Sequence, residues 1–299
     1  MSTQQTYFHI FNSPEEMFRK AKSVTLESLK GFCNASDTFA GCGSSDSFYG
    51  DWARTCRKFE NSEFDDEAAL TDEIIDDINT IDFNEIKWKF MQRLCEGDVV
   101  DVERFLANNE RCWNGCRRIP KARRSIRIYV NFGGNCFRTR QELAVAGAVG
   151  VTFSEIMESM GIAAEIWAVA QSIGMDANGN DYIDMIKVKA QNEYADMGLI
   201  NFILGDDGVF RNAMFRINCI HAVENGFDTS FGLGRSEAAS LDDLGLTDEE
   251  KESAIIVPQI FDRESAKEWL KEVLKDQEKL HNLTRAKDVN SLMSGFDVA

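Results

Sequence analysis

The part of this chain best suited to bind a ligand is a glycine-rich turn that follows an apolar run. Residues 126–130 (IRIYV) have the composition of a buried strand, and residues 131–136 (NFGGNC) come directly after them. In an open α/β sheet, ligands bind at the carboxyl ends of the strands. We expect a second turn, residues 205–208 (GDDG), at the same edge. The candidate binding residues are Asn131, Gly133, Gly134, Asn135, Asp206 and Asp207.

Two other patterns have features of metal sites. Residues 176–184 (DANGNDYID) resemble the start of an EF-hand loop, but the sixth position is Asp181 instead of glycine and the twelfth is Lys187 instead of glutamate. The turn of a β-hairpin explains the same residues. Cys112 and Cys116 would supply half of a zinc site, yet the eight cysteines include no Cys-x-x-Cys pair. We therefore interpret the cysteines as buried free thiols.

A basic cluster interrupts an acidic sequence. The chain has a formal charge of −17, whereas residues 111–124 contain Arg117, Arg118, Arg123 and Arg124. One interpretation is a solvated linker that pairs with the protein's own acids, and the alternative is a contact with an anion or nucleic acid. The net charge repels phosphates, so we do not expect nucleic acid as the main partner.

Composition favours a folded protein with a large core. The 299 residues are 43% hydrophobic, and no run approaches the ~18 apolar residues that a membrane span needs. There is no apolar N-terminal signal segment, and the cysteines fit a reducing compartment. We expect a soluble protein without membrane contact, located in the cytoplasm.

The elements that hold the candidate turns alternate between strands and helices. Apolar residues at helical spacing, caps and short apolar runs give the positions. Strands are expected at residues 126–130, 163–173, 182–188 and 254–260, with the second and third paired as an antiparallel hairpin. Helices are expected to begin at Pro14 and to cover residues 52–59, 65–82 with a solvated acidic face, 139–160, 196–204, 209–223, 247–250 and 264–280.

The order of strand, glycine turn, helix and hairpin resembles a von Willebrand factor A domain. In that family, the turn after the first strand carries Asp-x-Ser-x-Ser and holds a divalent cation. The matching positions here are Asn131, Gly133 and Asn135, so an amide replaces the carboxylate and one hydroxyl is missing. We expect a turn held by asparagine side chains, with no cofactor. The alternative is Mg²⁺ or Ca²⁺ at Asn131 and Asn135.

A second resemblance covers about residues 95–170. This part is similar to uncharacterised von Willebrand A-like proteins of tailed phages and mobile elements, through GDVVDVERFL at residues 97–106, Cys112-Trp113, the basic cluster and the strand-turn-helix. The resemblance implies a fold and a phage setting, which means the host cytoplasm or the virion. It implies no defined chemistry.

These observations predict an α/β protein with a small Rossmann-like open sheet of von Willebrand A type flanked by helices. We divide the chain into a mainly helical N-terminal region (1–110), a basic linker (111–124), the α/β domain (125–280) and a frayed C-terminal tail (281–299).

The functional hypothesis is a non-enzymatic, phage-type protein that binds another protein at the carboxyl edge of the sheet. Paired acids such as Asp76-Asp77 have no catalytic spacing, and an acidic surface explains them. The resemblance implies an AAA+ ATPase as a partner. The alternatives are a virion-associated protein that assembles with copies of itself, and a divalent-metal-dependent enzyme.

Overall fold

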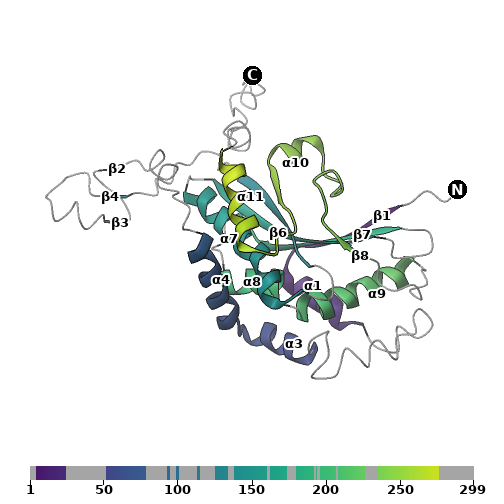
Figure 1. The fold of residues 1–299 in the computed structure, drawn as a ribbon. Helices are drawn as coiled ribbons and strands as arrows, with labels where there is room; N and C mark the ends of the chain where they lie inside the picture. Colours follow the sequence, from purple (N-terminus) through teal and green to yellow (C-terminus); the bar gives the residue numbers. More distant parts are fainter. Residues whose placement is uncertain are drawn as a thin grey trace, which may run out of the picture.

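A mixed six-stranded sheet forms the centre of the protein, as seen in a computed structural model (Figure 1). The structure describes residues 5–24, 52–78, 93–94, 99–100, 113–114, 125–133, 138–159, 162–173, 180–191, 193, 196–206, 208–225 and 235–275. The strands are β1 (Thr6–Phe11), β5 (Ser125–Asn131), β6 (Ala163–Ile173), β7 (Asp181–Lys189), β8 (Arg235–Glu237) and β9 (Ala254–Val257).

The strand order is β1-β7-β6-β5-β9, and β8 pairs with the end of β6. Three pairings are parallel: β1 with β7, β5 with β6, and β5 with β9. Strand β6 pairs antiparallel with both β7 and β8. The chain is therefore an α/β protein with a mixed, mostly parallel open sheet flanked by helices, as the sequence predicted at this level.

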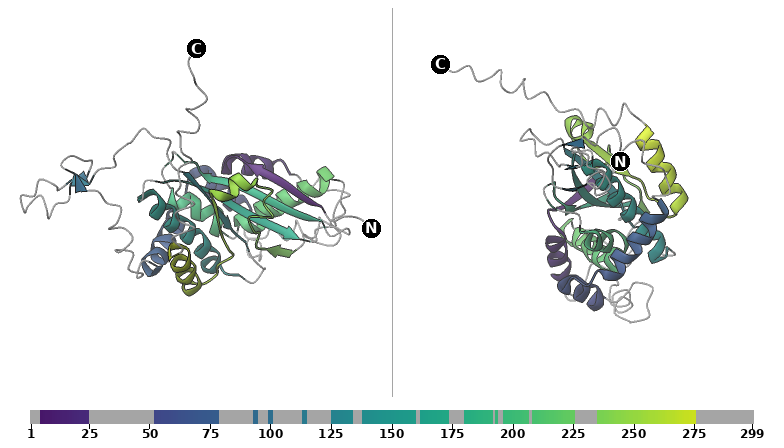
Figure 2. Two further views of the ribbon diagram at one scale, coloured as in Figure 1. Left: turned by 90° about the horizontal axis from the view of Figure 1, so that it is seen from above. Right: turned by 90° about the vertical axis from the view of Figure 1, so that its left-hand side faces the viewer.

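The long helices cover one face of the sheet, and the short helix α10 lies over the other (Figures 1 and 2). The helices are α1 (Pro14–Lys22), α3 (Trp52–Asn61), α4 (Asp65–Ile78), α7 (Arg140–Ser159), α8 (Met197–Gly205), the π-helix η1 (Val209–Ala213), α9 (Met214–Asn225), α10 (Asp248–Glu252) and α11 (Arg263–Lys275). None of the helices in the described ranges is long and apolar enough to span a bilayer.

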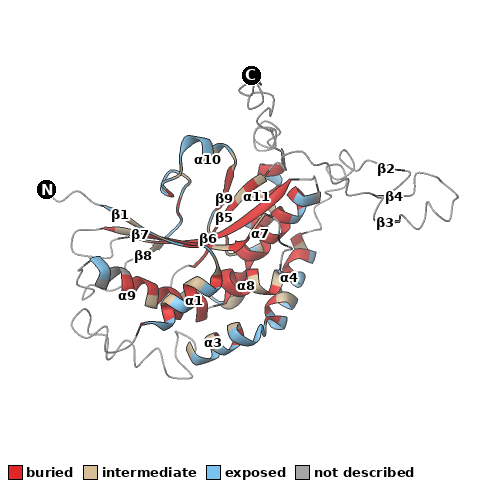
Figure 3. Cartoon of the chain, turned by 180° about the vertical axis from the view of Figure 1, so that it is seen from behind, coloured by how far each residue is buried: buried red, intermediate tan, exposed pale blue. Residues whose placement is uncertain are grey.

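The core has two unequal parts because alternate strand residues point to opposite faces. On the helix side, Ile126, Ile128 and Val130 of β5 pack with the apolar faces of the long helices. On the other side, Tyr129 and Trp167 pack with Leu244 from residues 238–253, which we call the cover segment. Figure 3 shows buried strands at the centre and an exposed α10 within this segment.

Most elements of the α/β part lie where the sequence placed them. The hairpin is confirmed by the antiparallel register of β6 and β7, in which Val169 lies opposite Met185. The capped helix is confirmed by a capping box between Thr247 and Glu250 at the start of α10. A glycine in α7 allows this helix to lie close to β5, since a Cβ on Gly150 would lie 2.8 Å from the Val130 side chain.

The N-terminal part adds a strand that the sequence analysis did not predict. Strand β1 pairs with β7 in parallel, with Phe8 beside Ile183 and Ile10 beside Met185. The helices of this part contribute to the same core as the sheet, through residues such as Phe18 and Ile74. Three further short strands, β2 (Arg93–Leu94), β3 (Val99–Val100) and β4 (Trp113–Asn114), pair antiparallel in the order β2-β4-β3.

Candidate functional site

Asn131, at the carboxyl end of β5, has its side chain engaged inside the protein. It is 1% exposed, and its Nδ2 donates to the carbonyl oxygens of Ala239 at 3.0 Å and Val257 at 3.1 Å. Its Oδ1 accepts the Ala239 N–H at 2.8 Å. A carboxylate could not make the two donor bonds, so this position requires an amide. Asn131 thus ties β5 to the end of β9 and to the cover segment, and its oxygen faces a backbone N–H instead of an open coordination site.

Gly133 lies under an aromatic ring from the π-helix. Its φ is +93°, which disfavours side chains, and a Cβ there would lie 2.2 Å from Cε2 of Phe210. The Phe210 ring also meets Phe132 edge to face, with 6.3 Å between centroids. The Phe210 N–H in turn donates to the carbonyl oxygen of Asp206 at 3.2 Å. Phe210 therefore joins the two turns that the sequence placed at one edge.

Asp206, which follows α8, is buried and contacts both backbone and cation. Its Oδ1 accepts the Gly208 N–H at 2.8 Å, and its Oδ2 lies 3.6 Å from Nζ of Lys58. Lys58 donates to Oε1 of Glu67 at 2.5 Å, and Arg140 also contacts Glu67. We call these four side chains, Lys58, Glu67, Arg140 and Asp206, the charge cluster. It joins α3, α4, the start of α7 and the end of α8.

The charge cluster corrects the expectation of a fully solvated acidic face on α4. Glu67 is 1% exposed, whereas Asp65 and Asp66 beside it are exposed. The two acids and two cations of the cluster have a formal charge sum of zero, which permits the burial of Lys58, Glu67 and Asp206. Both carboxylates are held by cations, so the cluster presents no free base or nucleophile at the surface. The cluster therefore has a structural role, which is to hold these helices together.

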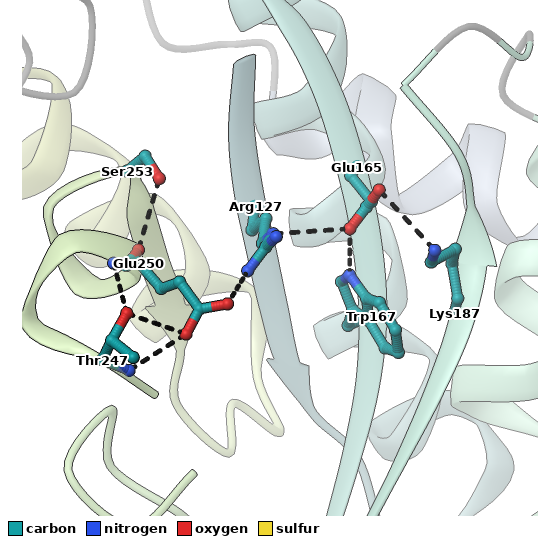
Figure 4. A network of polar contacts seen from close by, with 7 residues as sticks. All are labelled: Arg127, Glu165, Trp167, Lys187, Thr247, Glu250 and Ser253. Atoms are coloured by element: carbon teal, nitrogen blue, oxygen red, sulfur yellow. Dashed lines mark hydrogen bonds and ion pairs between the residues drawn. The ribbon is translucent and has the colours of Figure 1, made fainter. Parts of the chain in front are cut away.

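A second polar network lies on the opposite face of the sheet, at the amino ends of β5 and β6 (Figure 4). Arg127 donates to Glu250 at 2.9 Å, and its Nε lies 3.7 Å from Glu165. The N–H of Thr247 and then Arg127 hold the pKa of Glu250 down to about 2. A hollow of about 450 Å³ beside this network is lined by Ser125, Arg127, Gln191, Thr247, Glu249, Glu250 and Ser253.

The open edge of the sheet carries the apolar surface that the sequence analysis missed. Among the described residues, the exposed large hydrophobic side chains are Phe8 at 39% and Ile10 at 55%, both on β1. A run of alternating β-prone residues, TYFHIF, is the signal that could have indicated this strand.

His9, between those two residues, anchors β1 to the rest of the protein. Its Nδ1 lies 3.6 Å from Asp184 on β7, and its Nε2 lies 3.1 Å from Glu224 on α9. Lys20 on α1 also contacts Glu224, at 2.6 Å. Burial opposes a charge on the imidazole, but the hydrogen bonds and charges of Asp184 and Glu224 outweigh it and raise the pKa of His9 above 6.5.

The remaining candidate binding residues and the four arginines of the basic cluster lie outside the described ranges. These are Gly134, Asn135, Asp207, Arg117, Arg118, Arg123 and Arg124. Where residues are described, no group of three His, Cys, Asp or Glu side chains is placed to hold a metal ion.

The described residues define an α/β protein with a mixed, mostly parallel open sheet, a buried Asn131 at the carboxyl end of β5 and exposed apolar side chains on the edge strand β1. A family model described as a domain of unknown function (DUF7192) matches residues 2–281, and the chain belongs to that family. No curated protein and no solved structure gives a match.

Proposed function

We propose that this protein acts without catalysis, as a protein-binding module built on a von Willebrand A-like sheet. The observation that carries the proposal is β1, an edge strand with Phe8 and Ile10 exposed. Exposed apolar side chains next to unpaired backbone groups form a surface that another chain can cover. A binding role explains why these two apolar side chains are exposed when the chain is alone, because a partner would cover them.

The carboxyl edge supports the same proposal by its chemistry. The order β7-β6-β5-β9, with an antiparallel β6–β7 pair, supports a von Willebrand A-like arrangement. At the position where that family has a cation-binding carboxylate, Asn131 makes three hydrogen bonds within the chain. Because the Asn131 side chain is already hydrogen-bonded within the chain, it gives no support to the hypothesis of a divalent-metal-dependent enzyme.

The setting and partner follow from the sequence resemblance. We propose a phage-type protein in the host cytoplasm, for which the resemblance implies an adaptor role toward an AAA+ ATPase. The acidic surface, with a chain charge of −17, favours a partner with basic segments.

Affinity capture with cross-linking, from cells that naturally produce the protein, tests the binding role. The bait is the full chain, compared with a Phe8→Ser/Ile10→Ser variant and with a control variant changed at Lys271 and Glu272, two exposed residues of α11. We expect a protein partner that is lost with the β1 variant and retained with the control. Enrichment of no protein over an empty tag would refute the proposal.

Self-assembly is the second candidate, and the sequence of β1 supports it. If two copies of β1 paired antiparallel around His9, Phe8 of one copy would lie opposite Ile10 of the other. A two-fold contact of this kind is self-complementary. The native mass in solution separates the two candidates, because a virion-associated assembly predicts a defined oligomer of the chain alone.

A further inference from the structure

The outer side of β1 carries backbone groups that no described strand uses. Figure 2 shows β1, in purple, along an outer edge of the sheet. The N–H of Asp181 on β7 donates to the carbonyl oxygen of Gln5 at 2.9 Å, so Gln5 faces β7. Because successive residues of a strand direct their backbone groups to opposite sides, the odd-numbered residues of β1 face β7. Thr6, Phe8 and Ile10 therefore face outward.

The usual protection of an edge strand is missing from β1. Natural edges carry lysine, proline or a bulge that prevents pairing with another chain. The six residues of β1, TYFHIF, contain neither lysine nor proline, and their register with β7 is unbroken. The opposite edge strand, β9, is followed directly by Pro258, which cannot donate a backbone hydrogen bond. Of the two edges, β1 is the one open to strand pairing.

An antiparallel second copy of β1, centred on Phe8, satisfies all the outward groups. In an antiparallel pair, opposite residues whose backbones face each other exchange two hydrogen bonds. Centring on Phe8 places Phe8 opposite Phe8, Thr6 opposite Ile10, and Ile10 opposite Thr6. Every outward residue of one copy then pairs with an outward residue of the other. The strand is thus complementary to itself in this register.

The neighbouring register, centred on His9, is less favourable. It would place Thr6 opposite Asn12, which follows the last residue of β1. The backbone N–H of Asn12 already donates to the Glu16 carboxylate at 2.7 Å. This register would also place His9 opposite His9, and like charges directly opposite each other are unfavourable when both imidazoles are protonated. Backbone and side chains both select the register around Phe8.

The side chains match in this arrangement because opposite residues of an antiparallel pair share one face of the sheet. Phe8 and Ile10 lie on the face of Ile183 and Met185, their partners on β7. Across the two-fold axis, the two Phe8 rings would lie side by side, and each Ile10 would lie beside Thr6 of the other copy. Each chain has a charge of −17, but β1 contains no Asp, Glu, Lys or Arg. Two copies can therefore meet here without opposing their acids within the strand pair.

We propose that two copies of the chain join through β1, antiparallel around Phe8, so that one continuous sheet runs through both copies. A two-fold contact of this kind is closed and leaves no unpaired β1 edge. The inference rests on the proposed function, since it takes β1 as the binding surface and names a second copy as its occupant. A pair of six-residue strands belongs to the small interfaces, under about 1,200 Å², so we expect a reversible dimer.

The test measures the native mass of the full chain by sedimentation from about 1 µM to about 1 mM protein. The variants are Ile10→Asp, Thr6→Lys, and both changes in one chain. In the double variant, the lysine of one copy faces the aspartate of the other at two equivalent places. Within one chain, positions 6 and 10 are about 13 Å apart along the strand, too far to pair. The control exchanges the charges of two exposed residues of α11, by Lys271→Glu with Glu272→Lys.

We expect a dimer that each single change on β1 weakens at least about tenfold. The double variant should recover most of this loss, and the control should dimerise like the natural chain. Hydrogen exchange should show the amides of Thr6, Phe8 and Ile10 gaining protection as the protein concentration rises. Salt should strengthen the natural dimer, because it screens the repulsion between two acidic chains. All changed positions are exposed, and thermal unfolding checks that each variant folds.

Three results would overturn the inference. A monomer over the whole concentration range would exclude the dimer, and a dimer that Ile10→Asp leaves unchanged would exclude β1 as its surface. Loss in both single variants without recovery in the double variant would exclude the register around Phe8.

The proposed function fails separately from this inference. A monomer that still captures a foreign protein through β1 would leave the proposed function standing and refute the self-pairing. A dimer that behaves as expected, with no foreign protein captured from the native cells, would refute the binding of a foreign partner and leave the self-pairing standing.

Discussion

Replacing Asn131 with aspartate would restore the carboxylate of the cation-binding pattern, and we expect it to destabilise this protein. The buried amide donates to the carbonyl oxygens of Ala239 and Val257. Aspartate removes both donors and leaves two buried acceptors unpaired, at about 1–3 kcal/mol each. The expected loss in the free energy of unfolding is therefore about 2–6 kcal/mol.

The pH dependence adds a signature to this variant. Burial raises the pKa of a carboxyl group, so the folded pKa of the introduced aspartate would exceed its unfolded value of about 3.9. The deficit should be smallest below that unfolded value and should grow as pH rises toward the folded pKa. Urea unfolding of both proteins across a range from about pH 3 to about pH 8 measures it.

A matched control separates the role of Asn131 from a general cost of burying a carboxylate. Asn218 is also buried, but its Nδ2 donates over a longer distance of 3.4 Å to Ser172. We expect Asn218→Asp to cost less than Asn131→Asp. A cost below about 1 kcal/mol for Asn131→Asp, or a rise in its melting temperature on addition of Mg²⁺ or Ca²⁺, would refute the reasoning.

Three other changes test the charge cluster, the turn at Gly133 and the anchor of β1. Lys58→Met should lower the free energy of unfolding by about 3–5 kcal/mol, because it leaves Glu67 and the rest of the charge cluster with one cation fewer; urea unfolding measures it. Gly133→Ala should cost at least about 1–3 kcal/mol, from the positive φ and the ring above it; an unchanged melting temperature would contradict this. For His9→Gln, the lost stability should be greatest below pH 6.5 and should vanish as pH rises through the raised folded pKa of His9. Unfolding at about pH 6 and about pH 9, with an NMR titration of the imidazole, checks it.

The sequence predicted the α/β part well because its signals are local. A twenty-residue helix such as α7 (Arg140–Ser159) carries apolar residues at regular intervals, and the hairpin has turn chemistry between two strand-length runs. Strand β1 has no such support, since it covers six residues and its partner is distant in sequence. The backbone of Gln5 bonds the side chain of Asn180, 175 positions away.

The sequence predicted where the candidate site lies, but it did not predict what the side chains there do. The sequence identified the turn at Asn131 but could not show that Ala239 and Val257, 108 and 126 residues further on, occupy its amide. In the same way, the acids of α4 look alike in sequence. In the structure, Glu67 is buried because Lys58 and Arg140 contact it from other helices.

The parallel pairing of β1 with β7 has a consequence for synthesis on the ribosome. Strand β1 is made before β7, and its partner follows about 175 residues later. At about 5–20 residues per second, this interval is roughly 9 to 35 seconds. During that time a strand rich in apolar residues, with no acid, lysine or arginine, is present on the nascent chain before its own sheet exists. Strand β1 is therefore a segment for which early shielding by a chaperone or a partner would matter.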